Sequence, residues 1–197
     1  MPSRHVLAGA SLLAVIAGCG QLQTPRENWR HQVDTSQEPP AAQIHLTALA
    51  ENEVAIVINA NATLGSHAGL FVGKRLLDPS GTYSFDRSED PDWPGPSLAD
   101  YVRFHMRDGK LVRVYRFRLA EADIHTITIR MDHAGWTLPL FCAATVKRTV
   151  KGVGPFAAIG NSGWDSPLAL AKELDRIVGS GTASGTCQMP GGERCRP

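Results

Sequence analysis

The 197-residue sequence predicts one α+β domain in which a small antiparallel sheet packs against helices. A short, β-branched and nearly all-apolar run at residues 53–59 is typical of a buried strand. The dipeptide Gly73-Lys74 joins two further apolar runs, and a two-residue loop with glycine first is typical of a β-hairpin. Segments with helical spacing and capping signals fill the second half, so helices are expected to cover the sheet.

The strands are expected mainly in the first part of the domain. Apolar or alternating segments predict strands at residues 53–59, 67–73, 75–78 and 110–119. Residues 78–97 are rich in Asp, Ser, Gly and Pro, so an irregular surface loop is expected there. The pair Asp108-Gly109 predicts a turn before the last strand.

The helices are expected at residues 98–106, 121–132, 142–151 and 167–178. Ser97 is the expected N-cap of the first helix and Ser166 that of the last. Pro167 suits the first turn of the last helix, and Gly179 suits the position just after its end.

Residues 121–132 are ambiguous, because Ile127, Ile129 and Met131 also alternate as they would in a strand. We favour a helix, since acidic residues at 121 and 123 suit the positive end of the helix dipole.

The N-terminus predicts export. A charged start, a short apolar run and small residues before Cys19 define a secretory signal at residues 1–18. The end of this run, Val15-Ile16-Ala17-Gly18-Cys19, resembles the lipobox of bacterial lipoproteins, which implies cleavage before Cys19 and lipidation of its sulfur. We therefore expect a protein anchored in the cell envelope, and Gly20 favours the periplasmic face of the outer membrane.

Three further regions follow the signal. Residues 19–43 are polar and proline-containing and are expected to form a tether, residues 44–179 the folded domain, and residues 180–197 a glycine-rich tail. In an oxidising compartment Cys187 and Cys195 are expected to form a disulfide in this tail, outside the core, where its removal would change stability little. Cys142 then remains unpaired, which is typical either of a buried apolar residue or of a reactive one.

Composition and spacing argue against several classes of function. A formal net charge of +1 gives no reason to expect a nucleic-acid partner. The seven histidines and four cysteines show no zinc-binding spacing, so neither a metal nor a cofactor is expected. Trp136 precedes the unpaired cysteine and is expected to pack in the core, with a place along a substrate groove as the alternative.

The candidate catalytic residues are Cys142, His67 and Asp78. Cys142 lies at an expected helix start, where unpaired N–H groups and the helix dipole stabilise a thiolate or an oxyanion. If Gly73-Lys74 is the hairpin loop, Val72 pairs with Arg75, and His67 and Asp78 then project from one face in diagonal positions. A carboxylate in that place orients an imidazole that acts as a base. The alternatives are a small core cysteine and a surface histidine at a strand end.

These residues also carry a resemblance. Gly65-Ser-His-Ala-Gly-Leu-Phe-Val-Gly73 followed by Leu76-Leu-Asp78 resembles the histidine hairpin of permuted NlpC-type papain-like proteins. Phe141-Cys-Ala-Ala-Thr-Val146 resembles the nucleophile helix of that family, which includes the lecithin:retinol acyltransferase-like enzymes. The resemblance implies a papain-like domain with Cys142 as nucleophile, His67 as base and, in the third place, Asp78, where the family more often has His or Glu.

The expected function is therefore that of an envelope cysteine hydrolase that cleaves amide bonds, with cell-wall peptide as the favoured substrate. An acyltransferase or acyl hydrolase acting on an acylated lipid is one alternative, since relatives use both kinds of substrate. A lipoprotein that binds without catalysis, with an occluded or uncharged cysteine, is the other.

Overall fold

The structure is a computed structural model that describes residues 38–61, 66–160, 165–181 and 185–195. The expected lipidation site Cys19 lies outside the described residues. All described residues belong to one unit of the chain, which begins at Thr35. Part of the expected tether is included, and there Glu38 forms ion pairs with Arg87 and Arg103.

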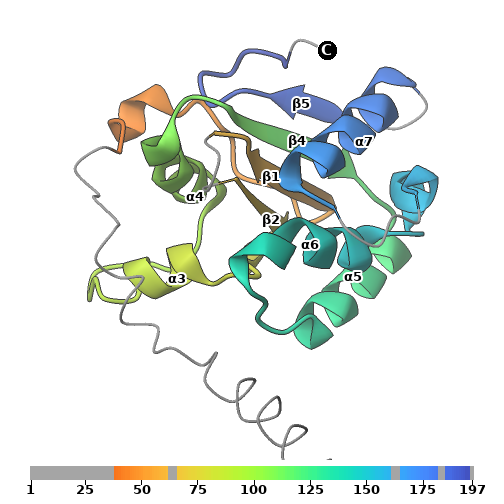
Figure 1. Ribbon diagram of the computed structural model, residues 1–197, viewed down its shortest axis with the longest axis horizontal. Helices are drawn as coiled ribbons and strands as arrows, with labels where there is room; N and C mark the ends of the chain where they lie inside the picture. Colours follow the sequence, from red (N-terminus) through yellow and green to blue (C-terminus); the bar gives the residue numbers. More distant parts are fainter. Residues whose placement is uncertain (1–37, 62–65, 161–164, 182–184, 196–197) are drawn as a thin grey trace, which may run out of the picture. The chain divides into compact units, whose positions relative to one another are not determined.

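A five-stranded antiparallel sheet forms the centre of the fold, with the strand order β3-β2-β1-β4-β5 (Figure 1). The strands are β1 (Glu53–Asn59), β2 (His67–Val72), β3 (Arg75–Leu77), β4 (Val112–Arg118) and β5 (Thr186–Gln188). Every strand expected from the sequence is present, and the observed hairpin register pairs Val72 with Arg75 as predicted. Gly73 has a φ of 55°, a left-handed conformation that this tight turn requires.

Helices cover both faces of the sheet. The α-helices are α3 (Thr82–Arg87), α4 (Leu98–His105), α5 (Glu121–His133), α6 (Cys142–Val150) and α7 (Pro167–Gly179). Short 3-10 turns are η2 (Ala41–Gln43), η3 (Met106–Asp108), η4 (Pro139–Phe141) and η5 (Gly154–Ala158). Figure 1 shows α6 and α7 lying across one face of the sheet, with α5 beside α6.

The alternation along β2 separates the two faces. Ala68 and Leu70 point into the main apolar core with residues of α6 and α7. Gly69 and Phe71 point to the other face, where they meet Tyr101 of α4. His67 belongs to this second face, because residues two apart in a strand share a side. The β2–β3 hairpin is therefore packed between two layers.

The helix predictions are confirmed with two corrections. Residues 121–132 are helical, and both expected serine caps accept backbone N–H bonds, from Asp100 and from Ala169. The interpretation of 78–97 as wholly irregular is wrong, because α3 forms there with Tyr83 fully buried in tertiary contacts. Gly179 is the last residue of α7 rather than the residue after it.

The C-terminal segment contributes to the domain. The predicted disulfide between Cys187 and Cys195 is present, and β5 pairs with β4 beside it. The expectation that this disulfide lies outside the core is wrong, since Cys187 is buried within the main apolar cluster and Cys195 packs against it. Glycine-rich composition did not reveal this strand, because a three-residue edge strand carries almost no periodicity.

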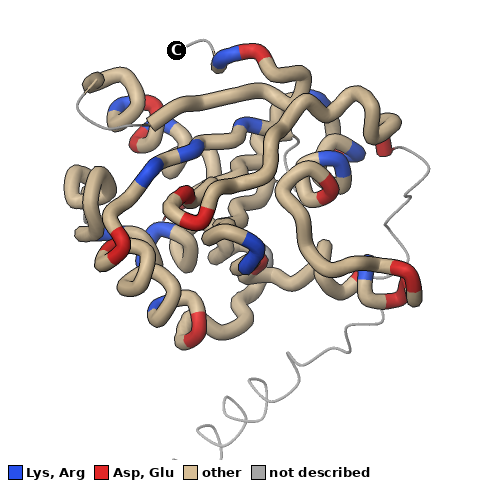
Figure 2. The backbone as a smooth tube through the Cα atoms, turned by 180° about the vertical axis from the view of Figure 1, so that it is seen from behind, with Lys and Arg blue, Asp and Glu red and all other residues tan. Residues whose placement is uncertain are grey.

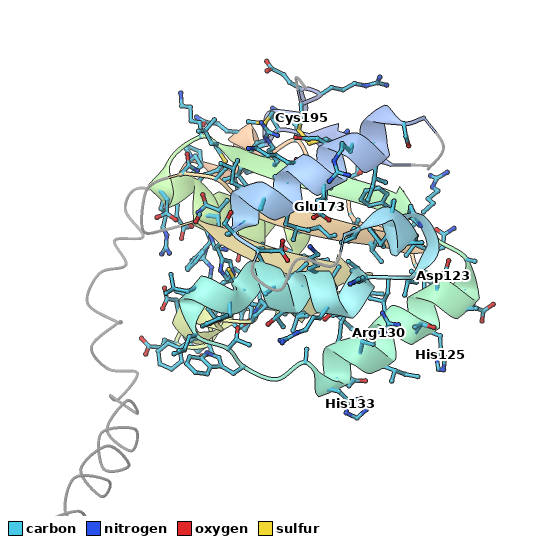
Figure 3. All side chains as sticks on the ribbon, turned by 45° about the vertical axis from the view of Figure 1, so that its right-hand side comes forward. Asp123, His125, Arg130, His133, Glu173 and Cys195 are labelled. Atoms are coloured by element: carbon cyan, nitrogen blue, oxygen red, sulfur yellow. A yellow bond between two sulfur atoms is a disulfide. The ribbon has the colours of Figure 1, made fainter. Side chains whose placement is uncertain are left out.

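Two sets of polar contacts hold α6 in place. The buried Lys147 Nζ lies 2.9 Å from an Asp165 carboxylate oxygen and 3.2 Å from one of Glu173. Arg130 of α5 donates to the carbonyl oxygens of Thr149 and Lys151 at the end of α6 (Figure 3). These contacts fix the helix that begins with the candidate nucleophile.

Charges of both signs are interspersed on the side seen in Figure 2, as the near-zero net charge leads one to expect. Within the described ranges, no helix is long and apolar enough to cross a membrane.

Candidate active site

The β2–β3 hairpin brings His67 and Asp78 together. β3 ends at Leu77, which pairs with Leu70, so Asp78 follows in the position opposite Gly69. His67 Nε2 lies 2.8 Å from Asp78 Oδ1, and both side chains are nearly buried. The pairing inferred from the turn is therefore an actual contact, which a one-residue change of register would have removed.

The Asp78 carboxylate is held by two donors. Its Oδ1 accepts from His67, and its Oδ2 accepts from the backbone N–H of Tyr83 at 3.1 Å in the first turn of α3. Burial would raise the pKa of Asp78, but the hydrogen bond and positive charge of His67 lower it below its ordinary value. The carboxylate is thus an anion that can orient the imidazole.

Cys142 is the first residue of α6, directly after the η4 turn. It is the free cysteine of the described chain and is fully buried. Its burial raises the thiol pKa, but hydrogen bonds from His67 and from the backbone N–H groups of Ala68 and Ala143 lower it overall. The sulfur therefore lies where a thiolate is stabilised.

His67 connects the other two residues. Burial opposes its positive charge, yet the contacts with Asp78 and Cys142 raise its pKa from 6.5 to about 10. Because Nε2 is bonded to Asp78, Nδ1 is the nitrogen left for the thiol, and Ser80 Oγ lies 3.4 Å from it. The arrangement favours a thiolate–imidazolium pair with a carboxylate behind the imidazole.

Sequence reasoning missed a second layer on α4. The His105 ring stacks on His67 with centroids 5.0 Å apart, and Tyr101 packs edge-on against His105 at 4.5 Å. Burial first, and then the charge of His67, hold the pKa of His105 well below its ordinary value. Tyr101 and His105 are four residues apart after a good N-cap, so a shared helix face was readable, but nothing indicated which strand it would meet.

An exposed apolar segment precedes Cys142. Its four large side chains have exposed fractions between 39% and 69%: Trp136, Leu138, Leu140 and Phe141. The Trp136 indole N–H donates to the carbonyl of Ser80 at 2.6 Å, and the Thr137 N–H donates to that of Pro79 at 2.7 Å. The segment is thereby tied to the chain just after Asp78. The expectation that Trp136 packs in the core is wrong, because the indole is 53% exposed.

Two of the remaining histidines lie away from this site. His125 and His133 project from the outer side of α5 in Figure 3. Over the described ranges, no group of three or more His, Cys, Asp or Glu side chains is placed to hold a metal ion.

Comparisons with known proteins do not assign the chain to a family. No family model matches it, and the comparisons with curated proteins and with solved structures also gave no match. The functional interpretation consequently depends on the geometry of the site itself.

Proposed function

We propose that this protein is a cysteine hydrolase that forms an acyl-enzyme on Cys142. The observation that carries this proposal is the buried His67–Asp78 pair, 2.8 Å apart, beside the Cys142 thiol, whose pKa the imidazole lowers. Nucleophile, base and orienting group in hydrogen-bonding reach of one another are the signature of covalent acyl transfer. A merely structural cysteine needs neither a buried imidazole nor a carboxylate behind it.

In this mechanism the Cys142 thiolate attacks a substrate carbonyl carbon and forms a tetrahedral oxyanion. N–H groups at the start of α6 are suited to stabilise that oxyanion. The imidazolium of His67 gives its proton to the leaving amine or alkoxide, which departs and leaves a thioester on the sulfur. Neutral His67 then takes a proton from water, and the resulting hydroxide attacks the thioester. Cleavage of the C–S bond releases the acid product and regenerates the thiolate–imidazolium pair.

We also propose the papain-like assignment, in permuted order. Its support is the succession of a histidine hairpin, a carboxylate at the end of the hairpin and a cysteine at the start of a helix on an antiparallel sheet. The export signal expected from the sequence suggests a location in the cell envelope, where the abundant amides are those of cell-wall peptides. An amide of this kind is the proposed substrate.

A second candidate substrate is an acylated lipid, and the exposed apolar segment favours it. Residues 134–141 include no charged side chain, and the segment leads directly into Cys142. An exposed apolar patch of this kind is typical of a binding surface. Hydrolysis of matched esters with short and long acyl chains separates the candidates. A preference for long chains that is lost in Trp136→Ala and Leu140→Ser supports the lipid, whereas equal rates support the peptide.

The burial of Cys142 bears on the non-catalytic alternative. With none of its surface exposed, the thiol can meet a substrate only if neighbouring side chains move aside. Occlusion alone would suit a binding protein. The pKa of the thiol is lowered, however, whereas burial in apolar surroundings would raise it, and this favours a reactive cysteine.

Trapping of the acyl-enzyme tests the proposed function. The full chain is incubated with an activated ester, quenched in acid and measured as intact mass. We expect one acyl group, mapped by digestion to Cys142, and its loss in Cys142→Ala and in His67→Ala. No adduct on the folded wild-type protein, or an adduct that persists in Cys142→Ala, would overturn the proposal.

A further inference from the structure

One buried hydroxyl beside the site has no hydrogen-bond partner. Tyr101 of α4 is fully buried, and its Oη bonds to nothing within the described part of the chain. A buried hydroxyl without a partner lowers stability and calls for an explanation.

The strand below this hydroxyl is shaped to admit it. A Cβ placed on Gly69 would clash with Tyr101 Oη and would lie 2.7 Å from Cζ, so only glycine allows the approach. Gly69 follows His67 by two residues on the same face of β2, and the hairpin register places Asp78 opposite it. The hydroxyl therefore lies over the place where the base and its carboxylate meet.

The hydroxyl keeps its proton in this place and can donate it to a hydrogen bond. Burial first, and then the charges of Asp78 and Cys142, hold the pKa of Tyr101 well above its ordinary value. Asp78 has one donor on each carboxylate oxygen, and each oxygen can accept a second. The carboxylate is therefore able to accept one more hydrogen bond, and the phenol beside it is able to donate one.

The need for that bond changes during turnover. While His67 is an imidazolium, its charge neutralises Asp78. After His67 has given its proton to a leaving group, Asp78 is a buried anion beside a neutral ring, and an additional donor then stabilises it most.

We propose that Tyr101 is a positioning residue whose hydroxyl donates to the Asp78 carboxylate when His67 is neutral. The bond keeps Asp78 ionised and the imidazole aligned for the deprotonation of water. The timing rests on the proposed hydrolase function, whereas the bond itself depends only on the charge of His67.

This bond has a measurable consequence for His67. Because the hydroxyl stabilises the neutral-imidazole state, its removal should raise the pKa of His67, by about one to two pKa units for a hydrogen bond to a charged group. The titratable groups that face His67 are Asp78, Cys142 on α6 and His105 on α4, and those that face Asp78 are His67 and His105. Tyr101→Phe changes none of them.

The test uses NMR titration of the His67 ring in full-length Cys142→Ala protein, with and without Tyr101→Phe. Removal of the thiolate takes away one of the two contacts that raise the His67 pKa to about 10, which makes the titration accessible. Tyr83→Phe is the matched control, since its hydroxyl bonds to Asp100 at 2.8 Å in the same aromatic layer.

We expect Tyr101→Phe to raise the His67 pKa, to leave the fold intact at neutral pH and, in the active enzyme, to lower kcat with little change in KM. Tyr83→Phe should not move the His67 pKa. An unchanged His67 pKa in Tyr101→Phe, or an equal rise in both variants, would overturn the proposal. The titration needs no substrate, so this outcome is independent of whether an acyl-enzyme forms.

Discussion

The Asp78→Asn substitution tests whether the carboxylate is held as a charged partner of His67. Asp78 uses both oxygens, one 2.8 Å from His67 Nε2 and the other 3.1 Å from the Tyr83 N–H. Asparagine keeps one acceptor and turns an NH₂ group toward one of these two donors. A buried donor left without an acceptor costs about 1–3 kcal/mol, so we expect a loss of that size in the free energy of unfolding.

The loss should depend on pH in a defined direction. Asp78 has a lowered pKa, so its contribution is present above its ordinary pKa of about 3.9 and is lost as pH falls through the lower folded value. His67 has its pKa raised from 6.5 to about 10, so its contribution is complete below pH 6.5 and is lost as pH rises toward 10. The difference in the free energy of unfolding between wild type and Asp78→Asn should be largest from about pH 4 to 6.5 and should become smaller as the pH rises further.

Urea unfolding at several pH values between about 5 and 9.5 measures this difference. Asp100→Asn is the control, because the charged partners of Asp100 are Arg87 and Arg103, which stay protonated throughout this range. Its loss of stability should stay constant with pH. A constant loss for Asp78→Asn as well would refute the charge pairing with His67.

Three further predictions concern the disulfide, the buried lysine of α6 and the expected lipid anchor. Reduction of the Cys187–Cys195 disulfide, or the double change to Ser, should lower the free energy of unfolding by about 2–3 kcal/mol, measured in urea, and an unchanged midpoint would contradict the core position of Cys187. Lys147→Met should lower the free energy of unfolding by about 3–5 kcal/mol, because it removes the cation that Asp165 and Glu173 share. Thermal unfolding measures this loss, with Lys172→Met on α7 as the control. Cys19→Ala should release the protein from membranes in a cell fractionation, and continued sedimentation with membranes would argue against the lipid anchor.

The contact between His67 and Asp78 could be predicted from the sequence, because a two-residue turn fixes the register of a hairpin and register decides which side chains share a face. Cys142 was joined to this pair by its expected place at a helix start and by the family resemblance, since no register relates it to the hairpin. The capped helices were also predictable, since Ser97 and Ser166 make local hydrogen bonds that do not depend on the rest of the fold.

What could not be predicted depends on contacts between distant segments. α3 exists because Tyr83 is buried and its N–H reaches Asp78, and neither fact is encoded within the polar loop itself. The stacking of His105 on His67 and the approach of Tyr101 to Gly69 require the crossing of α4 over β2, which no local pattern specifies. Burial of Cys142 is likewise a property of the assembled fold.

The ionisation of the Cys142 thiol tests the central claim most directly. The ultraviolet absorbance of the thiolate, taken as the difference from Cys142→Ala, reports the charge of this buried group without requiring a reagent to reach it. We predict that the wild-type thiolate forms below the ordinary thiol pKa of about 8.5, and that His67→Ala raises the pKa of the thiol, because only the Ala68 and Ala143 N–H groups then oppose the effect of burial. If wild type and His67→Ala titrate together at or above the ordinary value, His67 does not activate Cys142 and the catalytic account is wrong.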